Sequence, residues 1–284
     1  MIRVGSDPEF WLRDKSGNLV PAPSVLPSDE QAGGINRPFY DGFQAEITTA
    51  PVDCPKDSVS SIRDAVAGMH SLREFGITPF VQPVVDVPKN ILDNCSKTVF
   101  EFGCSPSHNA YTGEVRDSAS ICELHAQYPN IMMAGGHIHL GMPGGAHKRN
   151  PVDTLVNHAS TFEFNYADII LVFEMLGVTL LNIAECSDPD LKPIFKIRRK
   201  MYGVAGEYRI TPYGIEMRSP SCAWVMSPEV TEMIYSAAVM AYYTVFSGQY
   251  MGLYDKIEPM KAIEAVNSSD MGACWDVHSK IVEI

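Results

Sequence analysis

Four stretches of the chain carry acidic, imidazole or guanidinium side chains two residues apart. They hold, in chain order, Asp7 and Glu9, Gln44 and Glu46, His137 and His139, and the pairs Glu207–Arg209 and Glu216–Arg218. Residues two apart on a β-strand point to the same face of a sheet. If the four faces meet, they form a polar wall that cannot be a core, because unpaired buried charges cost several kcal/mol each. Such a wall suits divalent metals: carboxylates with an imidazole bind Mg²⁺ or Mn²⁺, and the histidine favours Mn²⁺ or a mixed site.

Each stretch also has an ordinary structural interpretation. A D-x-E pair on a strand is typical of a solvated face, and two E-x-R pairs are typical of cross-strand salt bridges, worth under ~1 kcal/mol each at a surface. The H-x-H stretch, "GGHIHLG" at 135–141, stands between glycines that permit close approach of the backbone. The order of the four stretches along the chain is a more specific signal of a functional site than any one of them.

The periodicity of apolar residues predicts the elements that position these side chains. Strands are expected at 3–14 with a hairpin partner near 19–23, at 39–51, 98–107 and 131–141, and as a hairpin at 206–220. Helices are expected at 56–76, at 150–177 with an internal break, and at 227–248, where Ser227 is the N-cap. This pattern predicts an α+β fold, an antiparallel sheet with helices on one face. Pro8 predicts that the first strand lies at an edge or is bulged.

Length and charge limit the classes of function. With 284 residues and 45% hydrophobic content, we expect a single domain over 1–284, with a helical C-terminal part from about 227. The net charge of −12 argues against general nucleic-acid binding and against a basic membrane-surface protein. Seven of the 22 Lys and Arg nevertheless lie between Lys192 and Arg218, which indicates a local phosphate or carboxylate site. The "KIRRK" run at 196–200 is either a further phosphate contact or a solvated helix end.

Cysteine usage and apolar runs point to the cytoplasm. The seven cysteines form no C-x-x-C pair and are expected to be reduced. No signal peptide is evident in residues 1–14, and the apolar run at 167–184 is interrupted by Glu174 and Asn182, so it is expected to be a core helix and not a membrane span.

The succession "GSDPEF", "DGFQAEITTAP", "GGHIHLG" and "YGVAGEYRITPYGIEMRSP" resembles the phage-type carboxylate–amine ligases, the type 2 amidoligases. These are grouped with glutamine synthetase and glutamate–cysteine ligase. The resemblance covers about residues 3–225 and implies a glutamine synthetase-like catalytic domain with a curved, mainly antiparallel sheet. It also implies ATP with Mg²⁺ or Mn²⁺ as cofactors, and the cytoplasm of the host if the protein is phage-encoded.

The resemblance assigns roles residue by residue. The metal ligands it implies are Asp7, Glu9, Glu46, His137 and Glu216. The nucleotide contacts it implies are His139, Gln44, Arg209 and Arg218, with Arg198 and Arg199 as further candidates. Arg209, Arg218 and Glu216 are the implied catalytic residues, the arginines binding the γ-phosphate and the transferred acyl phosphate.

The implied reaction joins a small-molecule or peptide carboxylate to an amine. The acid attacks the γ-phosphorus of ATP to give an acyl phosphate, and the amine then displaces phosphate. No membrane partner is expected, and a homo-oligomer is left open. The sequence names neither the acid nor the amine.

This chain departs from the glutamine synthetase pattern in two places. The first-strand pair begins with Asp7, whose side chain is shorter than glutamate. Glutamine synthetases carry a metal-binding glutamate eight residues before the one matching Glu46, and Pro38 stands there, with Asp41 the nearest carboxylate. Because the chain opens directly on the metal-binding strand, we expect a site built within one chain.

Two other functions stay open. A metal-dependent hydrolase or oxygenase also uses an H-x-H pair, but it does not need the arginines of the late hairpin. A non-catalytic relative would bind ATP with Mg²⁺ and release no ADP with any acid and amine.

Overall fold

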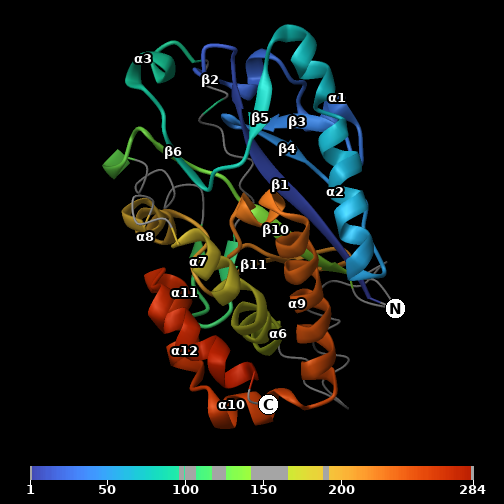
Figure 1. The fold of residues 1–284 in the computed structure, drawn as a ribbon, viewed down its shortest axis with the longest axis vertical. Coiled ribbons are helices and arrows are strands. Elements are labelled where there is room, and N and C mark those ends of the chain that lie inside the picture. Colours follow the sequence, from blue (N-terminus) through green and yellow to red (C-terminus); the bar gives the residue numbers. More distant parts are fainter. Residues whose placement is uncertain are drawn as a thin grey trace.

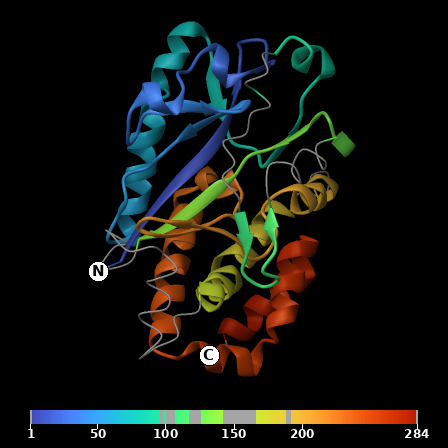
Figure 2. The same ribbon diagram turned by 180° about the vertical axis from the view of Figure 1, so that it is seen from behind.

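The structure, a computed structural model, describes residues 2–95, 99, 107–116, 126–141, 166–187 and 192–282. These residues form a mixed α+β fold in which a large open sheet packs against helices (Figures 1 and 2). Each strand pair in the described residues is antiparallel. The predicted α+β class is confirmed.

The larger sheet runs in the order β3-β4-β1-β10-β12-β11-β7-β8, and β2 and β5 also pair with β1. A separate pair is formed by β6 and β9. The strands are β1 (Arg3–Arg13), β2 (Leu19–Val20), β3 (Pro38–Asp41), β4 (Gln44–Ile47), β5 (Thr78–Phe80), β6 (Val84–Asp86), β7 (Ser107–Asn109), β8 (Val115–Arg116), β9 (Ile131–Met133), β10 (Gly136–Gly141), β11 (Glu207–Thr211) and β12 (Gly214–Met217).

Most of the longer helices gather in the lower half of the molecule as drawn in Figure 1, and α2 flanks the sheet above them. The helices are α1 (Asp29–Ala32), α2 (Ser58–Ala67), α3 (Lys89–Leu92), α6 (Tyr166–Phe173), α7 (Thr179–Glu185), α8 (Lys192–Met201), α9 (Pro228–Phe246), α10 (Tyr250–Lys256), α11 (Pro259–Ser268) and α12 (Met271–Val282). A π-helical turn, η5 (Glu174–Val178), joins α6 to α7, and a 3-10 helix, η6 (Cys222–Met226), precedes α9.

The strands at the centre of the sheet have one apolar and one polar face. Alternate side chains of β10 and β12 are fully buried in the main core, where they pack with residues of α6 and α9. These core residues are Ile138, Leu140, Ile215 and Met217. Because side chains alternate along a strand, the residues between them, His137, His139 and Glu216, point to the other face.

Two details of the sheet differ from the sequence-based expectation. Residues 39–51 are not one strand: β3 and β4 form a hairpin whose two-residue turn is Gly42–Phe43, and the φ of 60° at Gly42 suits the first place of that turn. The strand β1 is interior, between β4 and β10, so the first of the two predicted alternatives, an edge position, is wrong, and the second, a bulge, stays a prediction. Pro8 is tolerated there because it is the last residue of β1 that pairs with β10.

Helix predictions hold where the structure describes the residues. The helix α9 begins after Ser227, whose side chain accepts a hydrogen bond from the Val230 amide. The predicted helix at 56–76 is α2 followed by a 3-10 turn, His70–Phe75, which ends at Gly76 with φ of 74°. The predicted strand at 98–107 lies mostly outside the described residues, as does the 150–165 part of the next helix.

The apolar segment Tyr166–Glu185 is a core helix. It has 20 residues and a mean hydropathy of 1.9, but 67% of its most apolar window is buried inside the protein, which is consistent with a soluble protein. In keeping with the expectation of reduced thiols, the described cysteines are free; they are Cys54, Cys95, Cys186, Cys222 and Cys274. Cys104 and Cys122 lie outside the described residues.

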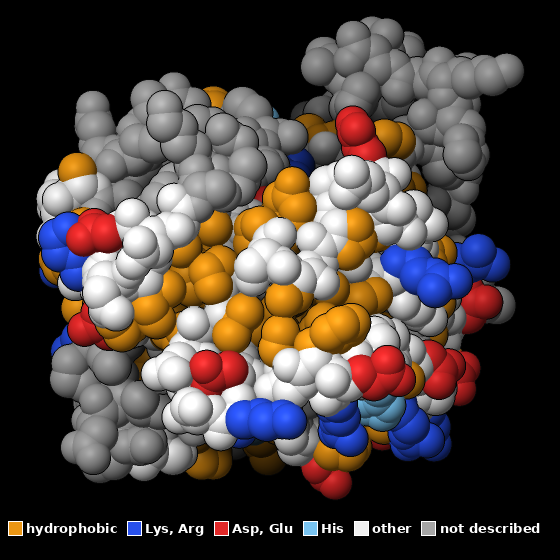
Figure 3. Space-filling view, turned by 90° about the horizontal axis from the view of Figure 1, so that it is seen from above, with side chains coloured by type: hydrophobic (Ala, Val, Ile, Leu, Met, Phe, Trp, Pro, Cys, Tyr) orange, Lys and Arg blue, Asp and Glu red, His pale blue; other side chains and the backbone are white. Residues whose placement is uncertain are grey.

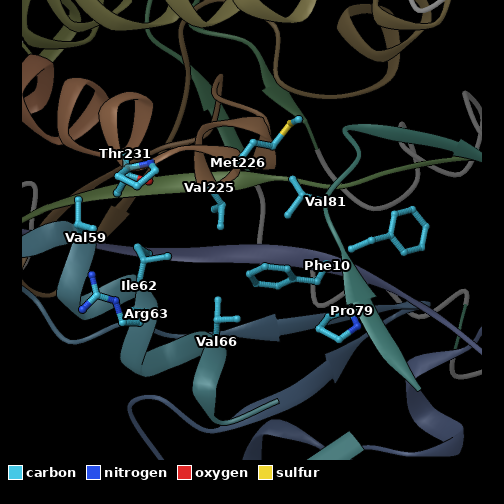
Figure 4. Close-up of a pocket in the computed structure, with 12 residues that line it drawn as sticks. Phe10, Val59, Ile62, Arg63, Val66, Pro79, Val81, Val225, Met226 and Thr231 are labelled. Carbon is cyan, nitrogen blue, oxygen red and sulfur yellow. The ribbon is translucent and has the colours of Figure 1, made fainter. Parts of the chain in front are cut away.

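An apolar cavity of about 420 Å³ lies between α2, β5 and the start of α9 (Figure 4). Phe10 of β1 and Ile62 of α2 are among its lining residues. Phe10 also belongs to an apolar cluster with Ala45 and Ile47, so the cavity is on the opposite face of β1 from its neighbour Glu9. Figure 3 shows hydrophobic side chains at the centre of one face of the molecule, with charged side chains around them.

Candidate active site

The register of the sheet sets the polar side chains of five strands beside one another. From β4 through β1, β10 and β12 to β11, the directly opposed pairs are Glu46–Glu9, Asp7–His137, His139–Glu216 and Glu216–Arg209. We call this series the polar line. It converts four separated stretches of sequence into one continuous surface.

The first group on the polar line consists of Asp7, His137 and Glu216. Their ligand atoms all lie within 4.8 Å of one another. The Nδ1 atom of His137 is 3.0 Å from Oδ1 of Asp7 and 3.5 Å from Oε1 of Glu216. On the other side of Asp7, Oδ2 lies 3.0 Å from Nε2 of His139. The group therefore offers carboxylate oxygen and imidazole nitrogen around one point.

The second group consists of Glu9, Asp41 and Glu46, whose ligand atoms likewise lie within 4.8 Å of one another. Asp41 reaches this group from β3 because the hairpin pairs it with Gln44. Gln44 donates a hydrogen bond of 3.4 Å to Oε2 of Glu9, and the Gly135 amide donates one of 2.6 Å to the same oxygen. Asp41 thus supplies a third carboxylate to this group.

The glycine before the H-x-H pair is required by this packing. A Cβ atom at Gly135 would stand 2.6 Å from Nε2 of His137 and 3.2 Å from Oε1 of Glu9. Any larger residue would push these two side chains apart, since real Cβ contacts are longer.

Burial and neighbouring charges shift the pKa values of these carboxyls in opposite directions. Burial raises the pKa of Glu9 to about 7, with His137 opposing the shift and Asp41 adding to it. Burial, then Asp7 and Asp41, raise the pKa of Glu46 well above its ordinary value. For Asp7, burial is outweighed by His139 and His137, which hold its pKa well below the usual range. Like charges held this close require a neutralising proton or cation.

The donor set fits a divalent cation. Among the described residues, the buried atoms Oδ1 of Asp7 and Nε2 of His139 make no hydrogen bond, although Oδ1 lies 3.0 Å from Nδ1 of His137 and Nε2 lies 3.0 Å from Oδ2 of Asp7. Oxygen ligands with one imidazole are the set that Mg²⁺ and Mn²⁺ accept. The residues that could hold such an ion are Asp7, His137 and Glu216 in one group and Glu9, Asp41 and Glu46 in the other.

The two hairpin arginines end the polar line. Arg218 is buried, forms an ion pair with Glu216 and donates a 2.7 Å hydrogen bond to the Tyr202 hydroxyl. Arg209 is more accessible, with 24% of its side chain exposed, and its NH1 lies 3.5 Å from Oε2 of Glu216. The Nε atom of each arginine is buried and has no hydrogen-bond partner within the described part of the chain.

Two tyrosines to which the sequence analysis assigned no role adjoin the site. The Tyr202 hydroxyl contacts Nε2 of His137 as well as Arg218. The Tyr213 hydroxyl contacts Nδ1 of His139, and the two rings stack with centroids 5.8 Å apart. Both tyrosines stand in the stretch "YGVAGEYRITPYGIEMRSP", but neither belongs to an E-x-R pair, so only its place beside the basic run or in the hairpin turn could have drawn attention to it.

Arg198 and Arg199 are interior residues, 1% and 4% exposed, so the interpretation of a solvated helix end is wrong for both. Arg198 donates hydrogen bonds to the carbonyls of Ser219 and Pro220. Arg199 donates to the carbonyls of Ser219 and Gly203 and to Oδ1 of Asn182. Their predicted contact with a nucleotide stays a prediction. The hydrogen bonds do not favour it, because the terminal amino groups of both guanidiniums already bind the protein.

Comparison with known protein families matches the late part of the chain. Residues 180–262 match the model of a family described as phage phiEco32-like COOH.NH2 ligase, type 2. The match includes Arg209, Glu216 and Arg218 and runs on into α11, beyond the expected limit near 225, whereas the strands β1, β4 and β10 precede it. No curated protein sequence matches the chain. The resemblance drawn from the motifs is thereby confirmed for this segment: over residues 180–262 the chain is similar to the phage phiEco32-like carboxylate–amine ligases of type 2.

Proposed function

We propose that this protein is an ATP-dependent carboxylate–amine ligase that requires a divalent cation and forms an amide through an acyl phosphate. The observation that carries this function is the polar line. Two groups of three residues suited to binding cations lie on one sheet face, and Glu216 of the first group contacts Arg209 and Arg218. A hydrolase or oxygenase does not need the two arginines, whereas phosphoryl transfer uses them to neutralise charge on the phosphate.

The two ligand groups and the two arginines have separate roles in this proposal. Asp7, His137 and Glu216 would hold one cation, and Glu9, Asp41 and Glu46 a second. A bound cation neutralises negative charge on phosphate oxygens. Arg209, the more accessible arginine, would bind the γ-phosphate through its planar fork, and Arg218 would stabilise charge on the phosphoryl group in transfer.

The reaction balances in two steps. A carboxylate oxygen of the acid attacks the γ-phosphorus of ATP, the bond to ADP breaks, and an acyl phosphate forms. The amine nitrogen then attacks the acyl carbon, phosphate leaves, and the amine loses a proton. The residues position the reactants and supply charge, and none of them bonds covalently to the substrate.

The proposal also covers the substrates, the cellular location and the residues on the nucleotide side of the site. The substrates are a small-molecule or peptide carboxylate and an amine, and the enzyme works in the cytoplasm as one ligase domain over 1–284. His139, stacked on Tyr213 beside Asp7, is the residue we assign to the nucleotide side of the site together with Gln44.

A screen for ADP release tests this function. Purified protein, ATP and Mg²⁺ are combined with a panel of carboxylic acids crossed with amines, and the products are identified by mass spectrometry. We expect ADP and an amide from one acid–amine class. Arg209→Gln should lower the rate on the order of 100-fold or more. Arg63→Gln, which changes an exposed arginine on α2, should leave the rate unchanged.

The outcomes separate the alternatives. ATP binding without ADP release across the whole panel would identify a non-catalytic relative. Hydrolysis of a substrate without ATP, lost in His137→Ala and retained in Arg209→Gln, would identify a metal-dependent hydrolase and overturn the ligase function.

A further inference from the structure

Tyr202 joins the two halves of the site. Its hydroxyl contacts Nε2 of His137 on the cation side and accepts a 2.7 Å hydrogen bond from NH2 of Arg218 on the phosphate side. Its ring centroid is 5.3 Å from the guanidinium carbon of Arg218 and 5.8 Å from that of Arg198. Among the described residues, no other hydroxyl contacts both a predicted cation ligand and a hairpin arginine.

The position of Tyr202 is fixed from behind. It directly follows α8, and its amide donates a 2.7 Å hydrogen bond to the Arg198 carbonyl. Arg198 and Arg199 of α8 in turn bind the carbonyl of Ser219, the residue after Arg218. Gly203, with φ of 67°, leaves room for the Arg198 guanidinium, which a Cβ atom would approach to 2.8 Å. The end of α8 and the end of β12 are therefore held as one unit.

The hydroxyl has two consequences for the neighbouring groups. An imidazole whose Nε2 is held by a hydrogen bond presents Nδ1 to a ligand, and here Nδ1 faces Asp7 and Glu216. The same oxygen binds one amino group of Arg218, so this arginine is not held by Glu216 alone. Without the hydroxyl, Arg218 would depend on the carboxylate that a cation also needs.

We propose that Tyr202 is a positioning residue that orients His137 for cation binding and holds Arg218 beside the cation site. This role rests on the proposed function, because it supposes that the Asp7, His137 and Glu216 group binds a divalent cation. Tyr202 does not touch the cation in this role; it acts through His137 and Arg218.

Mn²⁺ binding to the full chain, without nucleotide, tests this role. Free Mn²⁺ is measured by electron paramagnetic resonance during titration of the wild type, Tyr202→Phe and Tyr235→Phe. Tyr235→Phe is the matched control, since it removes a buried hydroxyl that lies 2.7 Å from Oγ of Ser6, on the helix-facing side of β1. We expect Mn²⁺ affinity to fall about 10- to 100-fold in Tyr202→Phe and to be unchanged in Tyr235→Phe.

A double-mutant cycle separates positioning from general weakening of the fold. If Tyr202 acts through His137, then Tyr202→Phe lowers Mn²⁺ affinity clearly in the wild type and much less in a His137→Asn background, where only the path through Arg218 and Glu216 remains. Equal losses in both backgrounds would overturn the role.

The remaining outcomes are also decisive. If the wild type binds Mn²⁺ and Tyr202→Phe binds it equally well, the positioning role is wrong while the ligase function stands. If the wild type binds neither Mn²⁺ nor ATP with Mg²⁺, the ligase function fails. If circular dichroism shows that Tyr202→Phe does not fold, Tyr202→Met is titrated with Mn²⁺ instead. If neither variant folds, Tyr202 is a stability residue and the positioning role is overturned.

Discussion

Behind the site lie buried ionisable residues whose charges are stabilised by hydrogen bonds and by one another, and not by water. Burial raises the pKa of both Glu174 and Glu185, and burial lowers the pKa of Arg199 to about 10. Tyr111 and the Gly206 amide donate hydrogen bonds to Glu174, and Ser221 donates one to Glu185. Glu174 is the first residue of the π-helical turn, so this irregular turn adjoins the end of the hairpin that carries Arg209 and Arg218.

The Arg199 side chain is expected to support stability more than ATP binding. Arg199→Ala leaves Oδ1 of Asn182 without its donor and removes one of the two buried guanidinium groups near Glu185. It should therefore cost about 3 kcal/mol of unfolding free energy, measured by urea denaturation. Lys200→Ala, at the exposed neighbouring position, should cost less than about 0.5 kcal/mol. A stable Arg199→Ala protein that has lost ATP affinity would instead support a phosphate contact.

At the scale of elements, the β3–β4 hairpin decides whether the second cation group exists. Glu9 and Glu46 face each other across β1 and β4, but Asp41 joins them only because the chain reverses at Gly42. The turn residue has φ of 60°, a conformation that residues with a Cβ atom adopt at a cost. The geometry of this ligand group is thus linked to one backbone conformation.

Gly42→Ala should therefore weaken cation binding as well as stability. The strain should cost about 1 kcal/mol of unfolding free energy, and the shifted hairpin should reduce Mn²⁺ affinity several-fold. Gly17→Ala is the matched control, because Gly17 has φ of 85° in the turn between β1 and β2, and no atom lies within 4 Å of the place that a Cβ would take. Urea denaturation should show similar losses of stability in both variants. Mn²⁺ titration should show a lower affinity in Gly42→Ala and an unchanged affinity in Gly17→Ala, and equal affinities in the two variants would contradict the prediction.

At the scale of the whole molecule, the polar line makes the cation-free fold sensitive to pH. A carboxyl with a raised pKa keeps its proton in the folded protein at a pH where the unfolded chain has lost it, so stability falls as pH rises through that window. For Glu9 the window runs from its ordinary pKa of 4.5 to about 7. The raised pKa of His139 acts in the same direction above 6.5, and the lowered pKa of Asp7 matters only when pH falls below its ordinary 3.8.

Stability in EDTA should therefore decrease by on the order of 3 kcal/mol between pH 5 and pH 7.5, the shift of the Glu9 pKa converted to free energy. Urea denaturation at both pH values measures it. Adding Mn²⁺ at pH 7.5 should recover stability, because an ion that binds only the folded state stabilises it by mass action. If the protein instead becomes steadily more stable from pH 5 to pH 7.5 in EDTA, the pKa of Glu9 is not raised by burial beside other carboxyls.

Local periodicity in the sequence is enough to determine several features of this protein. Alternation along a strand places His137 with His139, and Glu216 with Arg218, on shared faces, and cap residues predict the start of α9 at Ser227. These features depend on residues within a few positions of one another, which is why sequence alone is enough for them. The same alternation predicts that polar and apolar side chains of β10 face opposite sides.

Only the tertiary structure decided which strands are neighbours and which side chains join the motif residues. The interior place of β1, the arrival of Asp41 from a hairpin, the contact of Tyr202 with His137 and Arg218, and the burial of Arg198 and Arg199 all depend on packing between distant segments. Strand register and side-chain burial are set by the free energy of the whole core, and no short window of sequence contains that information.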